Sequence, residues 1–277
     1  MPRLAWITDP HLNFVSSERL EGFINEINES RPDILLIGGD IGEADSFEKY
    51  LHALADACRV PIYFVFGNHD YYRGSIANVR LAARRLTHKS NLLHWLPETG
   101  VVRISESTSL IGHGGWGDGQ IGDFLASDVV LNDYLLIEEL RATRRGESRL
   151  LENILTPALL ERLKSLGQDA AASLERHLHD ALGQSNQIIV LTHVPPFLEA
   201  CWHEGRLSDE NWSPHFTCHA VGEVLRDTMR RHPDKSMTVL CGHSHGAGRA
   251  QILDNLEVVT GGAVYREPEV QRVWEVT

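Results

Sequence analysis

Short apolar runs alternate with amphipathic stretches along the first third of the chain. The runs at 4–8, 34–37 and 61–66 are rich in Ile, Leu, Val and Phe and lack alternating polar positions, which is typical of strands buried on both faces. Between them, apolar residues recur at helical spacing within 17–27 and 47–54. The order strand, helix, strand, helix, strand predicts parallel strands joined by helical crossovers, and hence an α/β fold.

The later part of the chain carries the same signals with different spacing. Further helices are expected at about 76–86 and 221–231, and Ser17 is expected to cap the first helix. Seven further segments are short and apolar enough to be strands: 92–95, 101–104, 109–111, 187–192, 237–241, 251–260 and 270–276. No strand pattern occurs between 123 and 182, where leucines recur at helical spacing. We interpret about 120–183 as a helical insertion, a cap or lid, within a single domain spanning 1–277.

Polar residues gather where the apolar runs end. Asp40 follows the run 34–37 and two glycines, which let the backbone turn sharply. Open α/β sheets place their chemistry at the carboxyl ends of their strands, so we expect these residues to meet. Asp9 and His11 lie two positions apart, and so do His243 and His245. This spacing points both side chains of a pair to one side of an extended backbone. The full set is Asp9, His11, Asp40, Asn68, His69, His193, His243 and His245.

These residue types point to metal ions. Carboxylates, imidazoles and one amide oxygen suit Mn, Fe, Zn or Ni. Thiolates are absent from the set, which disfavours a structural zinc site. Seven oxygen or nitrogen ligands are too many for one ion with an open position and suit two ions that share Asp40.

The order of the motifs resembles that of the calcineurin-like metallophosphoesterase superfamily. The matching blocks cover roughly residues 4–250 and are Asp9-Pro-His11, Gly38-Gly-Asp40, Gly67-Asn-His-Asp70, His193 and Gly242-His-Ser-His245. The resemblance implies a four-layer α/β/β/α sandwich with two mixed sheets flanked by helices. It also implies the ligand sets, in which Asp40 bridges the two ions. Asp9, His11 and His245 would hold one ion, and Asn68, His193 and His243 the other.

The resemblance also implies hydrolysis of phosphate esters by a hydroxide that bridges the two ions, since a metal pair lowers the pKa of water towards neutrality. His69 is expected to be catalytic and either to protonate the leaving oxygen or to stabilise charge on the phosphoryl group. Asp70 is expected to orient the His69 ring and hold it protonated. Five further residues are expected to contact the substrate: His113, Trp116, His203, Arg206 and Tyr71. For His113, Trp116 and Tyr71, a purely structural role in a turn or in packing is the alternative.

Composition narrows the setting. The chain has 26 basic and 38 acidic residues and a net charge of −12, which disfavours binding to nucleic acid or an anionic membrane. Its four cysteines are too few for a disulfide scaffold. It has no apolar run long enough to span a bilayer and no basic N-terminal region followed by an apolar core. We therefore expect a cytoplasmic protein that does not bind membranes.

Three functions remain open at this point. The leading one is hydrolysis of a small phosphate ester, diester or monoester, because an acidic chain with a helical cap suits a compact ligand. A nuclease with the same binuclear site would need a basic groove with interleaved aromatic residues, and the only short basic cluster is 141–145. A non-catalytic scaffold could dispense with His69, which is retained. Homo-oligomerisation through the leucine-spaced helices stays open, and a further zinc site among Cys201, His203, His215, Cys218 and His219 is disfavoured by its spacing.

Overall fold

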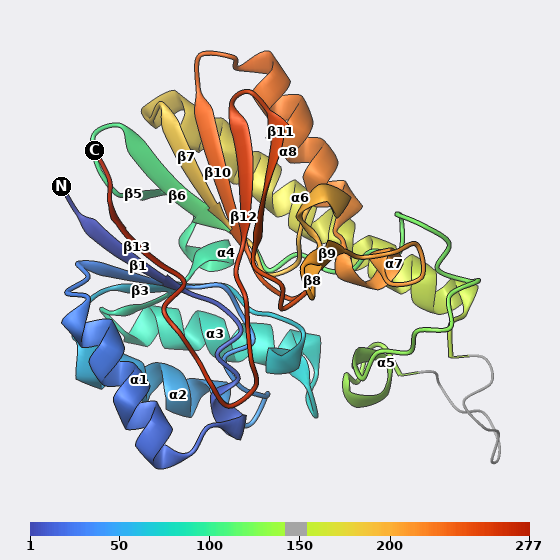
Figure 1. Ribbon diagram of the computed structural model, residues 1–277, viewed down its shortest axis with the longest axis horizontal. Helices are drawn as coiled ribbons and strands as arrows, with labels where there is room; N and C mark the ends of the chain where they lie inside the picture. The colour runs from blue at the N-terminus through green and yellow to red at the C-terminus, as the bar shows by residue number, and fades with distance from the viewer. Residues whose placement is uncertain (142–153) are drawn as a thin grey trace.

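The computed structural model describes residues 1–141 and 154–277, in which two sheets pack face to face between helices (Figure 1). The first sheet has the order β13-β1-β2-β3-β4 and is parallel except for β13. Its strands are β1 (Arg3–Ile7), β2 (Ile34–Ile37), β3 (Ile62–Phe64), β4 (Leu93–Trp95) and β13 (Arg272–Glu275). The predicted βαβ pattern is therefore confirmed for the first third of the chain.

The second sheet has the order β11-β12-β10-β7-β6-β5. Its four central strands are parallel, and the two edge strands β11 and β5 are antiparallel to their neighbours. Its strands are β5 (Val102–Arg103), β6 (Thr108–Gly112), β7 (Gln187–Leu191), β10 (Ser236–Cys241), β11 (Gly248–Leu253) and β12 (Leu256–Thr260). Both sheets are mixed, as the family resemblance implied.

Helices cover the outer face of each sheet. The first sheet carries α1 (Ser17–Glu29), α2 (Phe47–Cys58) and α3 (Ile76–Lys89), and the second carries α6 (Pro157–Gln184) and α8 (His219–Arg231) (Figure 1). Ser16, not Ser17, caps α1, because its hydroxyl accepts a hydrogen bond from the Arg19 amide. The short elements are η1 (Leu12–Phe14), η2 (His69–Tyr71), α4 (Leu96–Thr99), α5 (Asp133–Leu136), η3 (Leu198–Ala200), β8 (Trp202–His203), β9 (Arg206–Leu207) and α7 (Ser213–Phe216).

The alternation of side chains along each strand divides the core into three apolar layers. Leu4 and Trp6 of β1 point between the sheets, where they join Leu240 of β10 in one buried cluster. Ala5 and Ile7 point the other way and pack beneath α1 and α2. This arrangement explains why the central strands lack polar positions, since both faces of each sheet are covered.

Residues 120–183 divide into two parts that occupy different places. Leu174 and Leu178, in the second half of α6, are buried in the cluster beneath the second sheet, so this half belongs to the outer helical layer. Leu159, Leu163 and Leu166, in its first half, join the cluster that includes Trp116, Phe124 and Tyr134. Residues 130–133, which lead into α5, instead line a cleft at the carboxyl ends of the strands. Leucines at helical spacing report a buried face but not what covers it, which is why the sequence pattern did not separate the two parts.

Residues 142–153 lie outside the described residues, and with them most of the basic cluster at 141–145. Among the helices that the structure describes, none is long and apolar enough to cross a membrane. The cytoplasmic location and the oligomeric state stay predictions.

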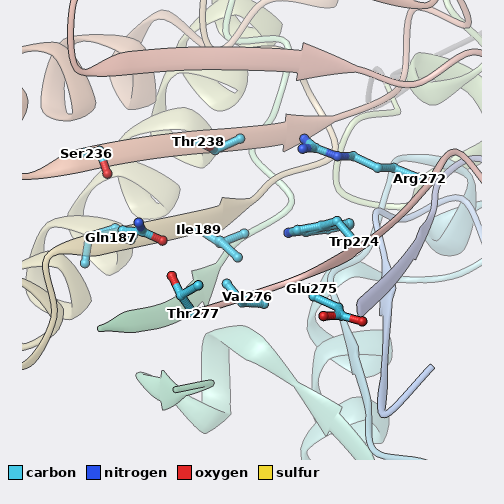
Figure 2. Close-up of a pocket in the computed structure, with 10 residues that line it drawn as sticks. Gln187, Ile189, Ser236, Thr238, Arg272, Trp274, Glu275, Val276 and Thr277 are labelled. Atoms are coloured by element: carbon cyan, nitrogen blue, oxygen red, sulfur yellow. The ribbon is translucent and has the colours of Figure 1, made fainter. Parts of the chain in front are cut away.

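A cavity of about 240 Å³ lies between the sheets at the amino-terminal ends of β7 and β10 (Figure 2). Gln187, Ser236 and Thr238 line it from the second sheet, and Arg272 and Trp274 line it from β13. None of the predicted ligands contributes to this cavity.

Candidate active site

Five strands deliver the predicted ligands to one place. Three of these strands belong to the first sheet and two to the second. The ligands therefore lie where the carboxyl ends of the two sheets meet, as expected for an α/β fold. Asp9 and His11 follow β1, Asp40 follows β2, Asn68 follows β3, His193 follows β7, and His243 and His245 follow β10.

One half of the site is formed by Asp9, His11, Asp40 and His245, whose ligand atoms all lie within 4.8 Å of one another. The Nε2 atom of His11 lies 3.6 Å from Oδ2 of Asp40 and 3.2 Å from Nε2 of His245. The Nε2 atom of His245 lies 3.5 Å from Oδ1 of Asp9. These four side chains enclose a space lined with oxygen and nitrogen atoms of the kind that hold a transition metal.

The other half of the site faces the second oxygen of Asp40. Nε2 of His193 lies 3.5 Å from Oδ1 of Asp40 and 3.1 Å from Oδ1 of Asn68. The ring of His243 lies with its centroid 4.9 Å from that of His193. Asp40 thus turns one carboxylate oxygen to each half, which is the arrangement of a bridging ligand.

Backbone carbonyls select which ring nitrogen each histidine of this second half presents. The Nδ1–H of His193 donates to the Gly38 carbonyl at 2.9 Å, which leaves Nε2 as the free donor atom. The Nε2–H of His243 donates to the His215 carbonyl at 3.3 Å, which leaves Nδ1 free. Both imidazoles are therefore oriented before any ion binds.

The ligands after β1, β2 and β10 sit on left-handed backbone, not on extended strand. The φ angles are 49° at Asp9, 42° at His11, 52° at Asp40, 68° at His243 and 60° at His245. The expectation that extended backbone aligns the ligand pairs is therefore wrong, although each pair does face the same site. A left-handed residue other than glycine costs about 1–2 kcal/mol, and such residues concentrate at functional sites.

The same carboxylates help to hold these turns in place. Oδ1 of Asp9 accepts a hydrogen bond from the His243 amide, and Oδ1 of Asp40 accepts one from the His69 amide, both at 2.9 Å. Gly242 and Gly67 lie so close to these two carboxylates that a Cβ atom at either glycine would collide with them. The glycines of the two motifs thus make room for the ligands.

Burial gives the site the electrostatics of a cation-binding centre. It raises the pKa of Asp40 to about 7 and also raises that of Asp9, while it lowers the pKa of His193 to about 4. No Lys or Arg of the described chain forms an ion pair with either carboxylate. A metal cation would balance the charge of buried carboxylates that have no positive partner, and neutral imidazoles are the form of histidine that binds metals. The residues therefore fit the implied pair of metals.

His69 lies beside this pair but outside the ligand cluster. Its Nε2 atom is 4.0 Å from Oδ2 of Asp40, and its ring stacks on Tyr72 with centroids 4.2 Å apart. Burial lowers the pKa of His69 to about 4. The His69 side chain also lines the cleft.

Asp70 does not contact the His69 ring, contrary to the expectation. Its Oδ1 accepts hydrogen bonds from the amides of Ile41 and Gly42, and its Oδ2 accepts one from Gly67. Consecutive residues in a helical turn point in different directions, and Asp70 follows His69 within η2. Asp70 therefore ties the loop after β2 to the loop after β3 and acts on the ligands through the backbone.

Asp133 contacts the predicted ligand Asn68 and was not indicated by the sequence. Its Oδ1 accepts hydrogen bonds from Nδ2 of Asn68 at 2.8 Å and from the Tyr72 hydroxyl at 2.7 Å. The contact with Asn68 fixes its amide with Oδ1 turned towards His193. Asp133 is 65 positions away from Asn68 and belongs to no motif, so no local signal could have identified it.

Comparison with known proteins agrees with this geometry. The family model described as calcineurin-like phosphoesterase matches residues 2–247. The chain belongs to the calcineurin-like phosphoesterase family. A dimetal phosphatase from Danio rerio has a similar structure, with a TM-score of 0.59, 14% identity and coverage of 96% of this chain and 89% of that chain. The phosphopantetheinyl hydrolase of Mycobacterium tuberculosis gives a TM-score of 0.62, 14% identity and coverage of 96% and 90%.

One curated relative matches over a shorter stretch. It is a transmembrane protein with a metallophosphoesterase domain from Danio rerio, 34% identical over 80 residues. The match covers 27% of this chain and 18% of that protein, so this phosphoesterase is aligned with less than a fifth of its relative's length. The two solved structures, at 14% identity, show a shared fold.

The cleft of this phosphoesterase, about 640 Å³ in volume, separates the residues expected at the substrate into two groups. His203 and Arg206 line it, on the hairpin formed by β8 and β9. Further lining residues that the sequence did not indicate include Leu207, Trp212, Phe216 and Tyr265.

His113, Trp116 and Tyr71 are buried and do not line the cleft. Nδ1 of His113 accepts a hydrogen bond from the Gly115 amide, and Trp116 packs on Tyr71 with ring centroids 5.6 Å apart. The glycines of the segment 112–119 allow close packing of the backbone. Gly114 and Gly117 lie against backbone carbonyls, where a side chain would not fit.

Proposed function

We propose that this phosphoesterase hydrolyses phosphate esters of small molecules with two metal ions held around Asp40. The observation that carries the proposal is the position of Asp40, whose two carboxylate oxygens face separate donor sets 3.5 to 3.6 Å away at the floor of an open cleft. Asp9, His11 and His245 would hold one ion. Asn68, His193 and His243 would hold the other, and Mn, Fe, Zn or Ni suits these donors.

When bound, the two ions would supply Lewis-acid chemistry that binds phosphate oxygens and activates water as the nucleophile. His69 would act on the leaving oxygen from the cleft wall. Its lowered pKa makes the ring neutral at pH 7 before substrate arrives. A neutral ring still donates its N–H, and a phosphate anion beside it raises the pKa and favours the protonated acid.

The charge of the cleft supports a compact ester over a nucleic acid. Asp133, Glu204 and Asp209 line it, whereas Arg206 is the sole Lys or Arg among its lining residues in the described chain. A nuclease needs a basic groove that follows the phosphate backbone. The cleft volume of about 640 Å³ lies within the range of small-molecule sites, roughly 300–1,000 Å³.

The test combines elemental analysis of the purified protein with hydrolysis of p-nitrophenyl phosphate and bis(p-nitrophenyl) phosphate. We expect about two ions per chain, hydrolysis of at least one ester, loss of hydrolysis with a chelator and recovery with added metal. Asp234→Asn, at an exposed position, serves as the control and should behave as the natural protein. Two bound ions without hydrolysis of either ester would favour a scaffold, and preference for single-stranded DNA would favour a nuclease.

A further inference from the structure

Large apolar side chains that remain exposed gather at the mouth of the cleft. Within residues 1–141 and 154–277, Trp212 and Tyr265 are each 45% exposed, Leu207 is 44% exposed and Val130 is 39% exposed. All four line the cleft. Contiguous exposed apolar surface of this kind marks a binding site, because isolated surface hydrophobes are ordinary but clusters are not.

A series of stacked rings leads from one metal half of the site to this mouth. Phe216 stacks on the ring of His243, with centroids 4.5 Å apart and an interplanar angle of 29°. Trp212 packs edge-on against Phe216 at 5.6 Å. Trp212 therefore lies two ring contacts outward from His243, a predicted ligand.

A second group of rings starts from the other metal half. Tyr265 lies over His11 with centroids 4.5 Å apart and beside His245 at 5.2 Å. Phe14 packs edge-on against Tyr265 at 5.4 Å. Flat apolar surface thus adjoins the ligands of both ions, and it does so within one cleft.

The charges around these rings restrict what they can bind. Glu204 and Asp209 line the same cleft and would repel a second anionic group, and Arg206 is the sole Lys or Arg among its lining residues in the described chain. The anionic phosphate belongs at the metals, so the group at the rings carries no negative charge. Aromatic side chains favour flat rings, on which they stack.

We propose that Trp212, Phe216, Tyr265 and Leu207, together called the aromatic rim, bind the organic group of the ester, and that this group is a flat ring without negative charge, such as an aryl group or a base. The inference rests on the proposed function, since it assigns the rim to the same substrate. It predicts discrimination against esters with small alkyl groups and against substrates that carry a second phosphate.

The test measures binding, which does not require turnover. Titration calorimetry of the metal-loaded protein compares phenylphosphonate with methylphosphonate, which share the phosphonate head and differ in the organic group. We expect phenylphosphonate to bind about tenfold more tightly, because stacking and apolar burial favour the ring. We expect Trp212→Ala to reduce this preference to about twofold and Trp212→Phe to retain most of it.

Leu81→Ala is the matched control, since Leu81 is 44% exposed on α3 and does not line the cleft. It should leave the preference unchanged. Equal affinity for the two phosphonates in the natural protein overturns the aromatic rim and leaves the proposed function standing. Binding of neither phosphonate contradicts the proposed function and the rim together. A preference that survives in both Trp212→Ala and Tyr265→Ala places the ring elsewhere and also overturns the inference.

Discussion

Two cavities lie at opposite ends of the same strands, and they differ in how their walls are made. The cavity of about 240 Å³ at the amino-terminal ends of β7 and β10 is walled by residues within strands, such as Ser236 and Thr238 (Figure 2). The cleft of about 640 Å³ at the carboxyl ends is walled by loops and short elements, and its ligands follow the strands without belonging to them.

The difference shows that side chains within a strand cannot converge on one point. Within β10, the register with β7 and the alternation of side chains fix where Thr238 points. Beyond the strand ends, left-handed turns at Asp40 and His243 release the side chains from that alternation. Side chains from both sheets can then converge on a point, which is why the predicted ligands meet at the carboxyl ends of the strands.

The largest expected effect is at the centre of the cleft. Asp40→Ala should lose both ions and lower kcat/KM by roughly 10³-fold or more, because both halves of the site share this carboxylate and the ions carry the chemistry. Elemental analysis and steady-state kinetics measure the two losses. A variant that retains two ions would show that Asp40 is not the bridge.

His69→Ala should keep both ions and lower kcat by roughly 10²–10⁴-fold, the range of a lost general acid. The reason is its position, with Nε2 4.0 Å from Asp40 and its ring on the cleft wall. Metal content and kcat are measured on the same sample. Loss of an ion would make His69 a ligand and would contradict its separation from the cluster.

Asp133→Ala should lower the affinity for the ion at Asn68, His193 and His243 by roughly 10–100-fold, as for other residues that orient a ligand. Asp133→Asn keeps a carbonyl oxygen that can accept from Asn68 Nδ2 and should recover part of the affinity. Competition with a chromophoric chelator measures each site. Glu138→Gln, at an exposed position in the same segment, is the control. Equal affinities in Asp133→Ala and the natural protein would remove Asp133 from the site.

Metal affinity should rise with pH until about 7 and then level off. Burial raises the pKa of Asp40 to about 7, so below that value a proton occupies the carboxylate that the ions need. Each unit below this pKa should weaken binding by about tenfold. Chelator competition between pH 5.5 and 8 tests the slope. A constant affinity over the acid part of this range would show that Asp40 is already ionised there.

The smallest effect is expected at the other end of the strands. Thr238→Val changes the cavity of Figure 2 and should alter kcat/KM by less than about twofold and the free energy of unfolding by no more than about 1 kcal/mol. Steady-state kinetics and urea unfolding provide the measurements. A large loss of activity in a variant of unchanged stability would break the contrast between the two cavities.

Most of the fold, and the convergence of the predicted ligands on one place, could be predicted because both depend on local sequence pattern. Each buried strand is an apolar run, and Asp9, Asp40, Asn68, His193 and His243 each come shortly after one. The topology of parallel strands then brings those ends to one edge without further information. The predicted ligands can therefore be identified in the sequence, even though contacting residues such as Asp9 and His243 are 234 positions apart.

The tertiary structure alone decided which loop residues face the cleft. His113 lies in an irregular glycine-rich stretch and Trp212 in an irregular stretch that contains tryptophan. Packing nevertheless buries His113 and leaves Trp212 exposed at the cleft. The partners of Asp70 and Asp133 were likewise decided by loops that meet in space, since a carboxylate can bond to any amide or hydroxyl that packing brings to it. Periodicity records whether a side chain is buried, and only the folded chain determines against what.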